Sequence, residues 1–386
     1  MLETRTRTFA SPGKYIQGPG ELTNLVEYTS LFGDKVFALI DSFFYNNLRK
    51  KLQNNYNKTT STLICKEFNG EVTEEEIKRV TEIAKEKNCN VVVGIGGGKT
   101  LDTAKAVAKN IEANIIISPT AASTDAPTSA LSVVYTKEGE HSHEIFYDKN
   151  PDIVLLDTEI VAQAPVRLLV AGMGDALATY FEAKARDKSN TANFVGNGYQ
   201  RTLASMAIAE LAYKTLLADG EKAKLAAEAN ACTEALENII EANTLLSGLG
   251  FESTGVAAAH GIHDGFTILE EVHHLYHGEK VAFGTIAQLV LENYSQEKIK
   301  EVIRFCNTVG LPTTLVDMGL NDIDREKIMD VAKEAAQSPL MEGEPFVVTA
   351  DMIFSAILAA DSLGQKYNWF NIFTNKGPAI IRRTNL

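Results

Sequence analysis

The sequence has few of the features that mark secreted or membrane proteins. Only four of its 386 residues are cysteine, at widely separated positions and without a CxxC pair. This argues against a disulfide framework and favours reduced thiols. No apolar stretch is long enough to cross a bilayer, and the opening MLETRTRTFASPGKY lacks the apolar core of a signal peptide. We therefore expect a cytoplasmic protein.

Positive charge is also scarce. The chain has 37 lysines and arginines against 50 aspartates and glutamates, a formal net charge of −13. Nucleic-acid binding depends on clustered lysines and arginines that contact phosphates, so the composition argues against such a partner. The 45% of apolar residues can fill sizeable cores, and the length predicts two domains.

Strand and helix patterns alternate over the first part of the chain. Apolar runs predict strands, and amphipathic stretches between them predict helices. Thr73, with Glu76 three residues later, predicts a capping box at the start of one of these helices. The alternation is typical of a mainly parallel, Rossmann-like sheet covered on both faces. The predicted strands are 35–41, 60–68, 90–95 and 113–120, and the predicted helices are 42–56, 74–87 and 98–110.

The pattern changes after residue 130. Residues 129–135 and 144–150 predict a hairpin across a polar turn, and 152–157 predicts a return strand. Beyond about Pro165, alanine- and leucine-rich stretches dominate and strand signals nearly vanish. We therefore expect an α/β N-terminal domain over residues 1–163 and an all-α C-terminal domain over residues 164–386.

Glycines gather in VVVGIGGGKT, between a predicted strand and a predicted helix. Such glycines let a backbone approach a ligand closely, and the amides at a helix start attract phosphate. Two familiar motifs fail here: GxGxxG needs glycine where Lys99 stands, and the P-loop needs glycine where Val93 stands. The loop predicts pyrophosphate binding by another arrangement. A tight turn without a ligand is the alternative.

Asp41 follows the first strong strand signal. Its carboxylate is suited to accept hydrogen bonds from a ribose hydroxyl, and an acid there disfavours a 2′-phosphate. This favours NAD over NADP. Capping of the next helix by Asp41 is an equally good explanation of the same residue.

Histidine is concentrated in one segment: five of the seven lie between residues 260 and 277. Neutral imidazole is the commonest protein ligand for transition metals. His260 and His263 share one helix face, and spacing alone does not choose between them. An anionic ligand is also expected. Asp175, placed at the start of an apolar helix after a Gly-Met-Gly turn, is the best candidate, with a helix N-cap as its alternative role.

The remaining histidines carry a simpler expectation. His273 and His274 are adjacent and therefore point in different directions on a helix, which favours the surface. His141 and His143 lie in a polar turn and are expected to face solvent.

Six segments together resemble a known family. They are GGGKTLDTAK, SPTAASTDAPTSALSVVY, GMGDALATYFEA, GLGFES, AAAHGIHDGF and HGEKVAFG. In this order they resemble the iron-containing alcohol dehydrogenase family, and within it the dehydrogenases that act on glycerol. The resemblance runs from about residue 10 to about residue 380. It implies a dehydroquinate-synthase-like fold with an active site between the two domains.

The resemblance also implies a metal site. The ligands would be Asp175, His260 and His277, which selects His260 over His263. Iron-dependent members carry a further histidine where Thr179 stands in this chain. Three protein ligands and an open fourth position suit catalytic zinc, so Zn²⁺ is expected and Fe²⁺ is less favoured.

The same resemblance implies cofactor and substrate contacts. Asp125 would contact polyol hydroxyls beside His260, and Phe251 would form an apolar wall near the substrate. NAD would lie along Asp41, Gly96, Gly97, Gly98, Lys99, Thr120, Ser123, Ser129, Leu131 and Tyr135.

The implied activity is NAD-dependent oxidation of glycerol to dihydroxyacetone, or of related vicinal diols, by a homo-oligomer, an octamer by resemblance. Enzymes of the same fold with phosphorylated substrates, glycerol-1-phosphate dehydrogenase and dehydroquinate synthase, are alternatives. They need cationic residues, and residues 120–131 and 251–269 contain no lysine or arginine. A binding protein without turnover is a further alternative, disfavoured because every implied ligand is present.

Overall fold

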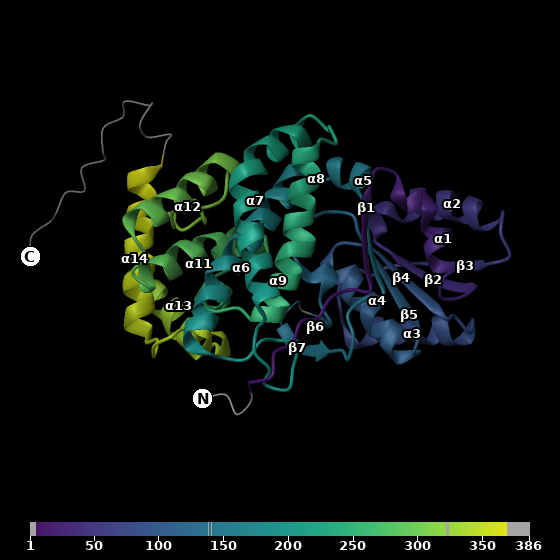
Figure 1. Cartoon of the computed structure of the whole chain (residues 1–386), viewed down its shortest axis with the longest axis horizontal. Helices are drawn as coiled ribbons and strands as arrows, with labels where there is room; N and C mark the ends of the chain where they lie inside the picture. Colours follow the sequence, from purple (N-terminus) through teal and green to yellow (C-terminus); the bar gives the residue numbers. More distant parts are fainter. Residues whose placement is uncertain (1–4, 138, 140, 322–323, 369–386) are drawn as a thin grey trace, which may run out of the picture.

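The computed structural model describes residues 5–368 apart from 138, 140, 322 and 323. The end of the expected second domain, 369–386, lies outside the described residues. Figure 1 shows a sheet with its helices at one end of the molecule and a group of long helices at the other. This arrangement confirms the expected class: a parallel α/β part followed by a helical part.

The central sheet has six strands in the order β1-β8-β5-β4-β2-β3, and every neighbouring pair is parallel. Its strands are β1 (Lys14–Gly18), β2 (Lys35–Ile40), β3 (Thr62–Glu67), β4 (Val91–Gly96), β5 (Asn114–Pro119) and β8 (Ile153–Asp157). Because the strands are parallel, their carboxyl ends meet at one edge of the sheet. Ligands of open α/β sheets bind at such an edge.

Helices cover both faces of the sheet. Alternate residues of β2 show this: Phe37 packs into one buried cluster, whereas Val36 and Ala38 pack into another. A parallel sheet buried on both faces needs near-continuous apolar strands, which is why these strands were predictable. The helical elements of this part are η1 (Glu21–Asn24), α1 (Leu25–Thr29), α2 (Ser42–Tyr56), α3 (Glu74–Glu86), α4 (Gly98–Asn110), η2 (Ala126–Thr128) and α5 (Thr158–Ala162).

The capping box predicted for α3 is only half correct. The Thr73 side chain accepts from the Glu76 amide at 3.2 Å, as expected. The Glu76 carboxylate, however, accepts from the Asn69 main chain and side chain and pairs with Arg79. A guanidinium and an amide side chain within reach replace the reciprocal bond to the N-cap.

The predicted hairpin forms, with a shift in its second strand. β6 (Leu131–Tyr135) pairs antiparallel with β7 (His141–Phe146), outside the main sheet. The second strand begins at His141 rather than at 144. His141 and His143 therefore lie on a strand and not in the expected turn. His143 is exposed, as expected, whereas the side chain of His141 lies outside the described residues. β1, which the sequence analysis missed, is a short edge strand with mostly half-buried residues and hence a weak apolar signal.

The rest of the described chain is helical, with no strand after β8 in the described ranges. Its elements are α6 (Val166–Ser189), α7 (Leu203–Glu228), α8 (Glu234–Glu241), the π-helix η3 (Ala242–Leu246), α9 (Ser247–Thr254), α10 (Ala258–Phe266), η4 (Glu270–Val272), α11 (His277–Leu291), α12 (Gln296–Val309), α13 (Arg325–Gln337), η5 (Pro339–Gly343) and α14 (Ala350–Tyr367). None of the described helices combines the length and apolarity that a membrane span requires. All four cysteines are free thiols.

Candidate active site

Three side chains from three helices meet at one point. Asp175 comes from α6, His260 from α10 and His277 from α11, and one ligand atom from each lies within 4.8 Å of the others. Asp175 Oδ1 is 3.5 Å from His260 Nε2 and 3.1 Å from His277 Nε2. That oxygen is buried and accepts no well-formed hydrogen bond from described atoms. A carboxylate oxygen and two imidazole nitrogens are a donor set for a divalent transition metal.

The position of Asp175 corrects one expectation. Asp175 neither begins a helix nor caps one, because α6 starts at Val166 and the Gly-Met-Gly segment is helical. The two glycines permit close packing instead of a turn. A Cβ at Gly172 would lie 2.0 Å from the Ala122 carbonyl oxygen, and one at Gly174 would lie 2.2 Å from the Gly278 carbonyl oxygen.

The HGEK segment brings His277 to Asp175. A Cβ at Gly278 would lie 1.8 Å from the Ala171 carbonyl oxygen and 2.9 Å from the Asp175 nitrogen, so only glycine lets α11 start this close to α6. Glu279 accepts from the Tyr276 amide at 2.7 Å and pairs with Arg167 of α6 at 2.6 Å. The motif therefore combines one metal-binding side chain with the contacts that hold it in place.

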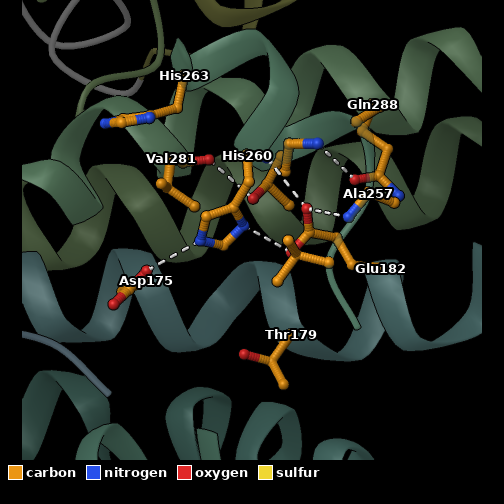
Figure 2. Close-up of polar contacts among 12 residues, drawn as sticks. Asp175, Thr179, Glu182, Ala257, His260, His263, Val281 and Gln288 are labelled. Atoms are coloured by element: carbon orange, nitrogen blue, oxygen red, sulfur yellow. Dashed lines mark hydrogen bonds and ion pairs between the residues drawn. The ribbon is translucent and has the colours of Figure 1, made fainter. Parts of the chain in front are cut away.

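Glu182 fixes the His260 ring, as Figure 2 shows. One carboxylate oxygen lies 2.8 Å from His260 Nδ1, and the other accepts from the main-chain amides of Ala257 and His260 at 2.8 and 3.0 Å. These are orphan amides at the start of α10, which has no cap of its own. With Nδ1 donating to Glu182, Nε2 is left as the ligand atom facing Asp175.

His263 contacts His277 rather than Asp175. Its Nε2 lies 3.0 Å from His277 Nδ1, and its Nδ1 lies 3.2 Å from the Asp264 carboxylate. Spacing alone did not distinguish His263 from His260, and the geometry separates them. His273 and His274 are exposed, as expected.

The electrostatics of the cluster follow from burial and charge pairing. Burial alone would raise the pKa of Asp175, but the facing His277 and His260 hold it well below its usual range. Burial would lower the pKa of His260, and the Glu182 and Asp175 carboxylates raise it well above its usual value. Burial, reinforced by His277, lowers the pKa of His263 to about 3. His263 is therefore neutral near pH 7, and its Nε2 is able to accept from His277.

Asp125 lies directly beside the three-residue cluster. Its main-chain amide donates to Asp175 Oδ2 at 3.4 Å, and its carboxylate accepts from Ser247 at 2.8 Å. Burial, together with the Asp175 carboxylate, raises the pKa of Asp125 well above its usual value. Phe251, expected as an apolar wall, is buried in α9 four residues after Ser247.

The glycine loop joins β4 to α4 at the carboxyl edge of the sheet. Gly96 ends the strand, and its carbonyl accepts from the Thr120 amide at 3.1 Å. Gly97 caps α4 without a side chain, and nothing lies within 4 Å of the position its Cβ would take. Asp41 caps α2 by accepting from Phe43, and its other oxygen lies 3.5 Å from Thr100 Oγ1. Gly96, Thr120 and Asp41, three of the expected cofactor positions, therefore lie side by side at the carboxyl ends of β4, β5 and β2.

The other expected cofactor residues are more dispersed. Lys99 pairs with Glu71 and lies over the Tyr135 ring, 5.3 Å from its centroid. Leu131 opens β6, and Ser123 is half-buried in the loop after β5. Ser129 is fully buried with its hydroxyl on the Ala126 carbonyl, so its side chain contacts its own loop.

Sequence reasoning missed Glu182 and Ser247. Glu182 follows Asp175 by seven residues, two turns further along one face of an otherwise apolar helix stretch. An acid at this spacing in an alanine-rich helix was a usable signal. Ser247 had no such signal. Its contact with Asp125 depends on the π-helix that directly precedes it, which no local sequence pattern predicts.

Comparisons with known proteins place the chain in a family. The model of the family described as iron-containing alcohol dehydrogenase matches residues 12–158. A glycerol dehydrogenase of Citrobacter freundii is 52% identical over 362 residues, which cover 94% of this chain and 99% of that protein.

Solved structures add the same likeness in three dimensions. The crystal structure of glycerol dehydrogenase from Schizosaccharomyces pombe has a TM-score of 0.91 at 36% identity, covering 97% of this chain and 95% of that one. A probable glycerol dehydrogenase from Sinorhizobium meliloti has a TM-score of 0.87 at 46% identity, covering 93% and 99%.

Proposed function

Since the chain belongs to the iron-containing alcohol dehydrogenase family, we propose that it oxidises glycerol, and related vicinal diols, to the corresponding hydroxyketone with NAD as hydride acceptor. The product from glycerol is dihydroxyacetone. The observation that carries the proposal is the meeting of Asp175, His260 and His277 directly beside Asp125. A metal donor set and a carboxylate able to bind a hydroxyl group thus share one site.

The metal that we propose is zinc, held by Asp175, His260 and His277. The buried Asp175 Oδ1 is the observation that fits it: it faces Nε2 of both histidines and accepts no well-formed hydrogen bond from the described atoms, which is otherwise costly for a buried carboxylate oxygen. Two nitrogens and one oxygen, with Thr179 in place of another imidazole, leave a position for substrate, as catalytic zinc requires. The chemistry that the metal supplies when bound is Lewis-acid polarisation, which lowers the pKa of a substrate hydroxyl.

NAD is proposed at the carboxyl edge of the sheet. The open space at Gly97 and the amides at the start of α4 fit a pyrophosphate. Asp41 lies at the neighbouring strand end, where its carboxylate disfavours a 2′-phosphate. When bound, NAD supplies the acceptor for the hydride that leaves the substrate carbon.

The chain's own residues bind and orient the substrate. The Asp125 carboxylate accepts a hydrogen bond from one polyol hydroxyl, which presents the neighbouring carbon to the cofactor. Such positioning converts binding energy into rate. Glu182 and His263 hold the imidazole rings of His260 and His277 so that Nε2 of each points at Asp175. Phe251 is proposed to exclude water on the remaining side.

The test compares glycerol with 2-propanol, which has only one hydroxyl. Wild-type enzyme with zinc should form NADH from both and should prefer glycerol. Asp125→Ala should lower kcat/KM for glycerol by up to about tenfold relative to 2-propanol, since a hydrogen bond contributes about 0.5–1.5 kcal/mol. Asp330→Ala, which removes an exposed acid paired with Lys333, is the control. Absence of NADH formation by the wild type would refute the proposal, and equal losses on both alcohols would refute the role of Asp125.

Phosphorylated substrates belong in the same assay, because enzymes of related fold act on them. The lack of lysine and arginine in residues 120–131 and 251–269 supports a neutral polyol instead. Assembly as a homo-octamer and a domain boundary at residues 163/164 stay predictions of the sequence.

A further inference from the structure

A chain of hydroxyl groups leads from α6 to Asp125. Thr179 Oγ1 lies 2.8 Å from Ser247 Oγ, and Ser247 donates to Asp125 Oδ2 at 2.8 Å. All three side chains are buried. Because the Ser247 hydrogen goes to the carboxylate, the Thr179 hydroxyl donates to Ser247. Hydrogen bonds in such a chain polarise and strengthen one another.

The methyl group of Thr179 also holds the side chain in place. Its methyl group would lie 2.6 Å from a Cβ at Gly250, so the threonine fills the space that this glycine leaves. Figure 2 shows Thr179 on the same helix as Asp175, with no drawn contact to His260 or Glu182. Methyl and hydroxyl both face α9, so the side chain acts on the Asp125 side of the site.

Ser247 lies where two segments pack closely, residues 242–252 and the loop 122–130. It directly follows the π-helix η3, an element often found at functional sites. Next to it, a Cβ at Gly248 would lie 1.9 Å from Thr128 Oγ1, which shows how closely the loop packs.

Further hydrogen bonds hold the loop 122–130 near both of its ends. Asn243 donates to the Ala122 carbonyl at 2.9 Å, and Glu252 accepts from the Ala130 amide at 2.8 Å. The main chain around Asp125 is therefore held by several contacts that do not involve Ser247. Its carboxylate, in contrast, has one hydrogen-bond donor among the described side chains, Ser247.

We propose that Thr179 and Ser247 are positioning residues that set the polyol selectivity of the enzyme by orienting the Asp125 carboxylate. Among the hydrogen bonds of the described residues, theirs join Thr179 to Ser247 and Ser247 to Asp125, so they act through Asp125. The inference rests on the proposed function, since it requires that Asp125 bind a substrate hydroxyl. It assigns a role to the position where the family's iron-dependent members were expected to carry another imidazole.

The test uses three variants in the zinc-loaded enzyme. Ser247→Ala removes the donor to Asp125, and Thr179→Val removes only the hydroxyl while its methyl groups keep the packing on Gly250. Thr179→Ser keeps the hydroxyl and loses the methyl. The readout is the ratio of kcat/KM for glycerol to that for 2-propanol, with zinc content and Tm measured alongside. Thr285→Val is the control, because Thr285 is equally buried but bonds only within α11, to Val281.

The expected results distinguish positioning from stability. Ser247→Ala should lower the glycerol to 2-propanol ratio about tenfold, Thr179→Val severalfold, and Thr179→Ser and Thr285→Val by less than twofold, with zinc content unchanged. An unchanged ratio in Ser247→Ala and Thr179→Val, in an enzyme where Asp125→Ala does lower it, would overturn the inference and leave the proposed function standing. If Asp125→Ala also leaves the ratio unchanged, the assignment of Asp125 itself fails.

Discussion

The metal cluster and the glycine loop build a site in opposite ways. The cluster takes single side chains from three helices, and both histidines are held by partners: Glu182 holds His260, and Arg167 with Glu279 holds the start of the helix that begins at His277. The loop presents main chain at the end of β4, and its charged residue, Lys99, is half-exposed and paired with Glu71.

The difference concerns preorganisation. A metal site needs atoms placed to a few tenths of an ångström, and outer partners commonly supply that placement. A pyrophosphate is bound by amides at a helix start, for which a strand end and glycines are enough. Substitutions should therefore act on the cluster through side-chain chemistry, and on the loop through the space that a side chain would occupy.

The largest effect is expected at the cluster itself. Asp175→Asn keeps the shape of the side chain and removes the anionic ligand, so bound zinc should be lost and kcat/KM should fall by roughly a thousandfold or more. Metal analysis and NADH formation measure the two consequences. Retained zinc with near-normal turnover would remove Asp175 from the ligand set.

A smaller loss is expected one contact further out. Glu182→Gln keeps an acceptor for the amides of Ala257 and His260 but removes the charge that faces His260 Nδ1. Partners of this kind typically change metal affinity by about 10–100-fold, and competition against a chelator measures it. An affinity within twofold of the wild type would show that Glu182 serves only to cap α10.

Substitutions in the glycine loop should act differently from those in the cluster, through the volume of the added side chain alone. Gly97 has ordinary backbone angles (φ −80°, ψ 176°) and open space at its Cβ position, so Gly97→Ala should leave Tm unchanged or slightly higher. If the pyrophosphate lies there, the NADH dissociation constant should rise about tenfold. Unaltered NADH binding would move the cofactor away from this loop.

Gly96→Ala provides the contrast on the same loop. Its Cβ would lie 2.7 Å from Thr100 Oγ1 and 2.8 Å from Asp41 Cβ. This variant should lose stability as well as NADH affinity, since a neighbour must shift.

The smallest effect on catalysis is expected at Glu344, which accepts from the Ala258 amide at the start of α10. Burial, followed by the charge of Glu292, raises the pKa of Glu344 from 4.5 to about 8. A raised folded-state pKa gives stability that is present below about pH 4.5 and is lost as the pH rises through about 8. Glu344→Gln, which cannot ionise, should be close to the wild type near pH 5 and exceed its unfolding free energy by roughly 3–5 kcal/mol at pH 9.

Urea denaturation at both pH values, with metal loading held constant, measures this difference. Glu342→Gln, at an exposed neighbouring position, is the matched control. A stability difference for Glu344→Gln that does not vary with pH would contradict the expected titration.

The sequence predicted the parts of the molecule that depend on local pattern. Buried strands such as β2 and β4, the helices between them and the helical second half follow from apolar periodicity. The edge strand β1 was missed because pairing with β8, not its own residues, makes it a strand. Asp175 was wrongly placed at a helix start, since glycine was taken as a turn signal where it serves close packing against Ala122 and Gly278.

The site itself was only partly accessible from sequence. The clustering of histidines was visible, but the choice of His260 over His263 came from family resemblance, because three-residue spacing puts both on one helix face. Contacts such as His277 with His263, or Ser247 with Asp125, join residues that are distant in the chain or depend on a π-helix. Tertiary packing determines these contacts, and no local sequence pattern predicts them.

The central claim is that Asp175, His260 and His277 hold one metal ion beside Asp125. Anomalous X-ray diffraction at the zinc absorption edge, on crystals of the zinc-loaded enzyme, tests it most directly. The account predicts one strong anomalous peak about 2.0–2.2 Å from a carboxylate oxygen of Asp175 and from Nε2 of both histidines. A zinc peak bound elsewhere, or none between these three side chains, would contradict it.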